Sequence, residues 1–140
     1  MQGVCVYVWP DHYPQSCPPN NSIELNGSVY RFINGANPTE RDFHSYYERQ
    51  PDKDWGVDAC KARGLSVLRT FADCGEMRKA IPALRKKRVA MASISIATGL
   101  VASTPSNSCE GHCTWWRSLQ PSDVVEFFTT FEEKNEVGHA

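Results

Sequence analysis

The sequence predicts a single α+β domain with a mixed or mostly antiparallel sheet and two or three short helices. Short strand and helix patterns follow one another without the regular alternation of a β-α-β protein. The 140 residues match the commonest size of one domain, so residues 1–140 are expected to share one hydrophobic core. Hydrophobic residues make up 41% and charged residues 22% of the chain, as in folded globular proteins and unlike disordered ones.

The most specific local pattern is a β-hairpin predicted around Asn26-Gly27. This pair tolerates the positive φ of a two-residue type I′ turn, and it lies between strand-like residues 23–25 and 28–33. The register of such a hairpin places Arg31 diagonal to Glu24 on one face. The other face, which we expect to pack on the core, carries Ile23, Leu25, Tyr30 and Phe32.

Helical spacing recurs in three segments of the chain. Helices are expected over residues 39–50, 57–63 and 70–81. Thr39 with Asp42 resembles a capping box before the first helix, and Gly64 occupies the C-cap position after the second. Strands are expected over residues 65–69, 89–96 and 100–103. Residues 124–131 suit either state, and their Val, Phe and Thr content favours a strand.

The charge balance and the hydropathy pattern argue against a nucleic-acid or membrane partner. Fifteen Lys and Arg oppose sixteen Asp and Glu, for a formal net charge of −1, so no overall field attracts nucleic acid or anionic lipid. The basic cluster within residues 78–88 is expected to be a solvated connection. The uncharged stretch 89–109 contains too many Ser and Thr residues for a membrane span. We therefore expect a soluble protein.

The six cysteines are expected to be reduced thiols in a cytoplasmic protein. The N-terminal residues lack the basic and long apolar regions of a secretory signal. A domain of this length can also bury a sufficient core without disulfides. A framework of three disulfides is the alternative.

The densest group of reactive side chains is Cys109-Glu110-Gly111-His112-Cys113. Thiolates and imidazole are ligands that Zn²⁺ prefers, so Cys109, His112 and Cys113 could converge on one ion. This pattern supports the hypothesis of a zinc-stabilised interaction domain, with a fourth ligand from Cys60, Cys74 or His44. In the alternative, the cysteines pack as small hydrophobes and His112 hydrogen-bonds a neighbouring carbonyl. A disulfide between Cys109 and Cys113 is a further alternative.

A catalytic thiol is another hypothesis for the same residue types. Cys60 or Cys74 would be the nucleophile, and His112 or His44 the base. Against it, both cysteines lie on apolar faces of predicted helices, where a buried neutral thiol would be inert.

The order Val29-Tyr30-Arg31-Phe32, Asp42-Phe43-His44-Ser45 and Leu65-Ser66-Val67 resembles the pattern of ADP-ribosyltransferases. The resemblance implies an NAD-using enzyme in which Arg31 holds the dinucleotide phosphates and Ser66 and a glutamate complete the site. A guanidinium suits a pyrophosphate, and Tyr46 or Tyr47 could stack on nicotinamide. The chain has neither a Ser-Thr-Ser motif nor a Glu-x-Glu motif, so the glutamate is unassigned among Glu126, Glu132 and Glu133. In the alternative, Arg31 simply pairs with Glu24 across the hairpin.

The leading hypothesis is a binding module for a small ligand or a protein partner, because no catalytic motif is complete. Trp115 and Trp116 follow His112 and would face opposite sides of a strand, so that one could be an exposed anchor for a ligand. Burial of both is the alternative. We therefore expect the ligand-binding surface to include His112, Trp115, Trp116, Arg31 and Tyr46. No cofactor other than zinc and no oligomeric state is predicted.

Overall fold

Two antiparallel sheets form the framework of the computed structural model, which describes residues 7–94 and 98–131. The four-stranded sheet has the order β1 (Ile23–Glu24), β5 (Gly99–Ser103), β6 (Cys113–Arg117), β3 (Leu65–Val67). The three-stranded sheet has the order β2 (Gly27–Ile33), β4 (Arg88–Ile94), β7 (Thr129–Phe131). All strand pairs within these sheets are antiparallel, and the predicted α+β class of a single compact domain is confirmed.

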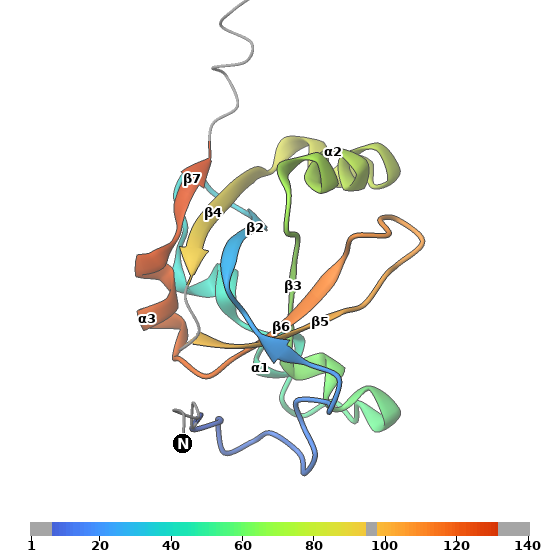
Figure 1. Ribbon diagram of the computed structural model, residues 1–140, viewed down its shortest axis with the longest axis vertical. Coiled ribbons are helices and arrows are strands. Elements are labelled where there is room, and N and C mark those ends of the chain that lie inside the picture. The colour runs from blue at the N-terminus through green and yellow to red at the C-terminus, as the bar shows by residue number, and fades with distance from the viewer. Residues whose placement is uncertain (1–6, 95–97, 132–140) are drawn as a thin grey trace, which may run out of the picture.

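Short helical segments connect the strands. The α-helices of the described residues are α1 (Tyr46–Arg49), α2 (Phe71–Ala80) and α3 (Pro121–Val124). Turns of 3-10 helix are η1 (Glu40–Phe43), η2 (Gly56–Asp58), η3 (Lys61–Arg63), η4 (Pro82–Lys86) and η6 (Val125–Phe127). Helix α2 lies at one end of the molecule, and residues 7–22, here called the N-terminal segment, lie at the other (Figure 1). Within the described ranges, no helix is long and apolar enough to cross a membrane.

The hairpin predicted at Asn26-Gly27 is wrong. Strand β1 pairs with β5, whereas β2 pairs with β4 in the other sheet. A type I′ turn needs positive φ at both central residues, and here Gly27 has φ 110° while Asn26 does not have positive φ. The chain therefore crosses from one sheet to the other. Leu25 is fully buried but Ile23 is 66% exposed, so the predicted apolar face is not the core face.

The main core lies between the two sheets. Its buried side chains come from both of them, including Val29 and Ile33 of β2 and Leu65 and Val67 of β3. A smaller cluster, formed around Leu68, Cys74, Val89 and Cys109, packs beside α2. Because successive side chains of a strand point to opposite faces, Trp115 of β6 enters the main core and Trp116 faces away from it.

One backbone contact joins the two sheets at the place where the candidate site forms. The N–H of Tyr30 in β2 donates to the carbonyl of Leu68 at 2.8 Å, and the N–H of Leu68 donates back at 2.9 Å. Leu68 directly follows β3, so this bridge sets β2 beside β3. As a consequence, Arg31 of β2 and Ser66 of β3 are neighbours in space.

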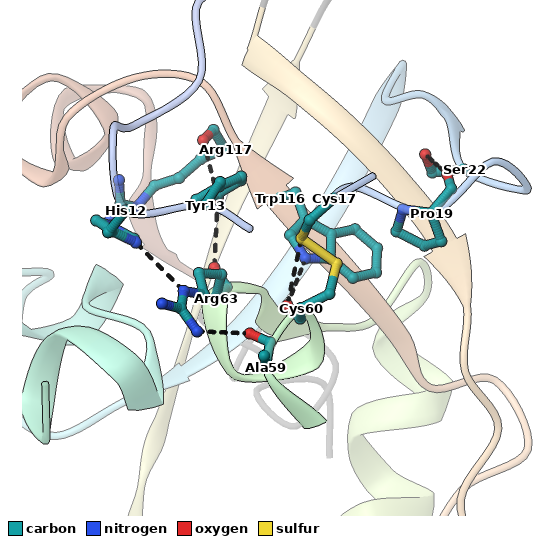
Figure 2. The surroundings of a disulfide bond; sticks show 10 residues. All are labelled: His12, Tyr13, Cys17, Pro19, Ser22, Ala59, Cys60, Arg63, Trp116 and Arg117. Carbon is teal, nitrogen blue, oxygen red and sulfur yellow. Dashed lines mark hydrogen bonds between the residues drawn. A yellow bond between two sulfur atoms is a disulfide. The ribbon is translucent and has the colours of Figure 1, made fainter. Parts of the chain in front are cut away.

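A disulfide between Cys17 and Cys60 fastens the N-terminal segment to the turn between η2 and η3, which precedes β3 of the four-stranded sheet. The expectation that all cysteines are reduced is therefore wrong for these two, and Cys60 is not available as a catalytic thiol. The segment covers Trp116, whose indole N–H donates to the carbonyl of Cys60 at 2.9 Å (Figure 2). Residues 7–22 contain no helix or strand, so a covalent bond adds stability that regular secondary structure does not provide. The free cysteines of the described residues are Cys74, Cys109 and Cys113.

The helix predicted over residues 39–50 is divided into η1 and α1 because two capping signals follow one another. The carboxylate of Asp42 accepts from the Thr39 N–H at 2.8 Å, which forms the predicted capping box at the start of η1. Ser45 then caps α1, since its hydroxyl accepts from the Glu48 N–H and the Glu48 carboxylate accepts from the Ser45 N–H. Each cap fixes the direction in which a new helical turn begins.

Candidate functional site

Arg31 is held at the junction of the two sheets by backbone carbonyls. Its Nε donates to the carbonyl of Asp42 and its Nη1 to the carbonyl of Ser66, both at 2.7 Å. Burial, together with the charge of Arg49, lowers the pKa of the guanidinium to about 10. Arg31 is therefore still a cation at neutral pH, and its plane is fixed.

Ser66 and His112 form a hydrogen-bonded pair beside this guanidinium. The Ser66 Oγ lies 2.9 Å from His112 Nε2. The other ring nitrogen, Nδ1, lies 2.9 Å from the carbonyl oxygen of Thr104. The Thr104 hydroxyl also lies 3.0 Å from Nδ1 and can donate or accept, whereas the carbonyl can only accept. The tautomer that satisfies the carbonyl carries the hydrogen on Nδ1 and leaves Nε2 to accept from the Ser66 hydroxyl.

The imidazole of His112 is neutral at pH 7. Burial is the main cause of the lowered pKa of His112, and the charge of Lys61 lowers it further, against the opposing effect of the hydrogen bond to Thr104. A neutral ring with an unprotonated Nε2 is a proton acceptor. The pair is thus a hydroxyl and a base in direct contact.

The loop between β5 and β6 positions His112. Where the two ends of this loop meet, the Thr104 N–H donates to the carbonyl of His112 at 2.9 Å. Next to His112, Gly111 passes so close to α2 that a Cβ there would lie 2.5 Å from an oxygen of Asp73. A larger residue at this position would therefore force the Asp73 carboxylate to move.

Two hollows meet at this pair. The first, here called the aromatic hollow, has a volume of about 220 Å³ and includes Trp55 and Lys61 in its walls. The second, the basic hollow, has a volume of about 270 Å³ and includes Arg31 and Arg49. The residues that line both hollows are Tyr46, Ser66 and His112.

The structure therefore brings together three of the predicted ligand-binding residues, Arg31, Tyr46 and His112. It does not bring Trp115 and Trp116 to the surface, since they are 0% and 2% exposed. Strand β6 is central in its sheet, with the main core on one face and the disulfide-fastened segment on the other. The alternative prediction, in which both tryptophans are buried, is confirmed, and neither indole can anchor a ligand.

The predicted zinc ligands Cys109, His112 and Cys113 do not surround one point. The described parts of the chain contain no group of three His, Cys, Asp or Glu side chains that could hold a metal ion. Both nitrogens of His112 are engaged by Thr104 and Ser66. The alternative prediction, in which His112 hydrogen-bonds a neighbouring carbonyl, is confirmed. Cys109 is buried beside α2, and Cys109 and Cys113 are free thiols.

Other residues of the site have no clear signal in the sequence. Thr104, which contacts His112, follows β5. The hollows are also lined by Trp55, which precedes η2, and by Arg49, which ends α1. The candidate glutamates do not contribute. Glu126 lines neither hollow, and Glu132 and Glu133 lie outside the described residues.

Comparison with known proteins identifies no relative of this chain. No known protein family, no curated protein and no solved structure matches this chain. Function has to be inferred from the chemistry of Arg31, Ser66 and His112, because a fold alone does not specify function.

Proposed function

We propose that the protein binds a small organic anion of the nucleotide type across the aromatic and basic hollows. The observation that carries the proposal is the meeting of a fixed guanidinium, a hydroxyl and a neutral imidazole where the two hollows join. A phosphate would bind on the side of Arg31. A ring would bind on the side of Tyr46 and Trp55.

Charge supports the phosphate half of this ligand. The basic hollow is lined by three cations, Arg31, Arg49 and Lys87, and by one carboxylate, Asp42. That carboxylate is occupied by backbone N–H groups, including that of Thr39 at 2.8 Å. A local excess of positive charge is informative in a protein whose net charge is −1.

The donors of Arg31 also suit an anion. A guanidinium has five N–H groups in a planar fork that matches the geometry of phosphate. Two of them donate to the carbonyls of Asp42 and Ser66, and no other acceptor among the described residues takes the rest. Held in this way, the side chain needs little reorganisation to bind a phosphate.

Aromatic side chains support the binding of the ring part of this ligand. Tyr46 is 62% exposed, and its ring centroid lies 6.3 Å from that of Trp55. Aromatic side chains bind planar rings by stacking. Small-molecule pockets usually measure roughly 300–1,000 Å³. Each hollow is slightly smaller than that, so a ligand with two parts that spans both fits better than one that fills either.

Isothermal titration calorimetry with AMP tests the proposal, with inorganic phosphate and adenosine as the two halves of the probe. Arg31→Gln should weaken AMP binding about tenfold or more, because a hydrogen bond to a charged group is worth roughly 1.5–3 kcal/mol. Tyr46→Ala should weaken the binding of AMP and adenosine but not that of phosphate. Arg85→Gln removes a positive charge outside both hollows and should leave binding unchanged. If the folded wild-type protein binds none of the three probes at millimolar concentration, the proposal is wrong.

The contact between Arg31 and Ser66 favours a second function, the NAD-using reaction that the resemblance to ADP-ribosyltransferases implies. That resemblance expects a strand arginine and a later strand serine to share one site, and here Nη1 of Arg31 donates to the carbonyl of Ser66 at 2.7 Å. Chromatography would detect nicotinamide released from NAD by the wild-type protein and not by Arg31→Ala. Binding of NAD without release of nicotinamide would exclude this reaction and leave the binding function.

A further inference from the structure

The Ser66–His112 pair has the arrangement of a nucleophile with its general base. The hydroxyl of Ser66 lies within hydrogen-bond distance of His112 Nε2, at 2.9 Å. Nucleophilic catalysis by serine requires such a base, itself oriented by a third group. In this chain the third group is the carbonyl of Thr104, 2.9 Å from Nδ1. Ser66 is exposed and lines both hollows, so a substrate can reach its oxygen.

Thr104 is itself held in place. Its N–H donates to the carbonyl of His112 at 2.9 Å, and its hydroxyl lies 2.8 Å from the hydroxyl of Thr114 in β6. These contacts fix the carbonyl beside Nδ1, and the Thr104 hydroxyl lies 3.0 Å from the same nitrogen. With the hydrogen on Nδ1, the base presents an unprotonated Nε2 to Ser66 before any substrate binds, as preorganised catalysis requires.

Hydrogen-bond donors are present for the negative charge that develops during acyl transfer. In an antiparallel strand, the N–H and the carbonyl of one residue point to the same edge. The carbonyl of Ser66 accepts from Arg31, so the Ser66 N–H lies on the edge that faces this guanidinium. One backbone N–H and one cation thus flank the nucleophile, as in sites that stabilise an oxyanion.

We propose that Ser66 and His112 hydrolyse a carboxylic ester, with Ser66 as nucleophile and His112 as general base. This activity rests on the ligand site proposed above, and it specifies the substrate as an ester that carries a negative charge for the basic hollow. It differs from the NAD-using reaction because an acyl group is transferred to the enzyme.

The reaction balances with water as the only co-reactant. The Ser66 oxygen adds to the carbonyl carbon of the ester while its proton passes to His112 Nε2. The bond between the carbonyl carbon and the alcohol oxygen then breaks, and the alcohol leaves with that proton. Water adds to the acyl group on Ser66 and gives a proton to Nε2, after which the acyl–oxygen bond breaks and Ser66 regains the proton. The products are a carboxylic acid and an alcohol, and nothing is oxidised or reduced.

A fluorophosphonate probe tests the nucleophile directly. Attack by Ser66 on phosphorus expels fluoride, so the intact protein should gain the mass of the probe less HF, with the adduct mapped to Ser66. Ser66→Ala should abolish the adduct. His112→Gln should slow labelling about 100-fold, since general-base catalysis contributes roughly 10²–10⁴. Ser22→Ala removes a hydroxyl that donates to the carbonyl of Pro19 away from the site (Figure 2), and it should label as the wild type does.

The outcomes separate this inference from the binding proposal. AMP binding and labelling are both measured on the folded wild-type protein, so the two results can be told apart. If folded wild-type protein binds AMP but forms no adduct, the hydrolase inference is wrong and the binding function stands. A label that persists in Ser66→Ala, or that forms equally fast in His112→Gln, also overturns the inference. An adduct on Ser66 without AMP binding would refute the binding proposal and the anionic substrate that rests on it, while Ser66 and His112 would stand as nucleophile and base.

Discussion

The hydroxyl oxygen of Ser66 lies 2.9 Å from Nε2 of His112, although the two residues are 46 positions apart in the chain. Pairing of β3 with β6 explains the contact, because it places Ser66 opposite Thr114. His112 precedes Thr114 by two residues, so its side chain lies on the same face of the sheet and diagonal to Ser66. The register of two strands thus creates the central contact of the site.

The protein should lose stability as the pH falls below about 6.5. Burial is the main cause of the lowered pKa values of His112 and His12 in the folded state, while the unfolded chain has the ordinary value near 6.5. In this range the unfolded state binds more protons, so the free energy of unfolding decreases as pH decreases. Urea unfolding between pH 7.5 and 5.5 measures this slope. His112→Gln should reduce the slope, and an unchanged slope would contradict the placement of His112.

Reduction of the Cys17–Cys60 disulfide should lower the free energy of unfolding by roughly 2–4 kcal/mol, because the bond closes a long loop in the unfolded chain. The two cysteines are 43 residues apart. Urea unfolding with and without a phosphine reductant measures the difference. The double variant Cys17→Ser, Cys60→Ser serves as the control, since it should resemble the reduced protein and respond no further to reductant. Equal midpoints for oxidised and reduced wild type would contradict the bond.

Substitution of two glycines by alanine should have opposite effects. Gly99 has φ 145°, and a Cβ there would lie 2.1 Å from the carbonyl oxygen of Trp116, so Gly99→Ala should prevent stable folding or lower the melting temperature strongly. Gly75 lies in α2 with nothing within 4 Å of a Cβ. Gly75→Ala should therefore stabilise the protein by about 0.5–1 kcal/mol. Melting temperatures compare the two, and the reverse order would refute the local geometry.

Loss of the buried cation Arg117 should cost far more than loss of an exposed one. Arg117 is 2% exposed, pairs with Glu48, and donates to the carbonyl of Phe43 at 3.0 Å. Arg117→Leu removes the partner of Glu48, whose side chain is 22% exposed, and breaking such a partly buried pair costs up to roughly 3–5 kcal/mol. Lys79→Ala breaks an exposed pair with Glu76 and should change stability by about 1 kcal/mol or less. Denaturant unfolding distinguishes them, and similar costs would contradict the burial of Arg117.

The fold class was predictable from the sequence, but the pairing of strands was not. Residues 28–33 and 100–103 have strand patterns that hold in β2 and β5. The signal of Asn26-Gly27 is local, whereas the actual partners of the flanking strands, β5 and β4, are distant in the chain. Residues 124–131 divide between helical turns and β7, since Pro121 starts a helix that the Val and Phe content alone does not reveal.

The site was predictable only in part, because its contacts also join residues that are distant in the chain. Arg31, Tyr46 and His112 have side chains with obvious chemistry, so residue type alone marked them as candidates. Thr104 acts through a backbone carbonyl, a group that every residue possesses. The burial of Trp116 depends on a segment joined through a disulfide, and sequence spacing does not reveal that covering.

The tautomer of His112 tests the central claim most directly. Long-range ¹H–¹⁵N correlation spectra of the imidazole distinguish a protonated Nδ1 from a protonated Nε2. At pH 7.5 we predict a neutral ring with the hydrogen on Nδ1 and an unprotonated Nε2, because the Thr104 carbonyl beside Nδ1 can only accept, while the Thr104 hydroxyl beside the same nitrogen can accept as well. Ser66→Ala should shift the Nε2 resonance without changing the tautomer. A ring protonated at Nε2 would show that His112 neither accepts from Ser66 nor serves as its base.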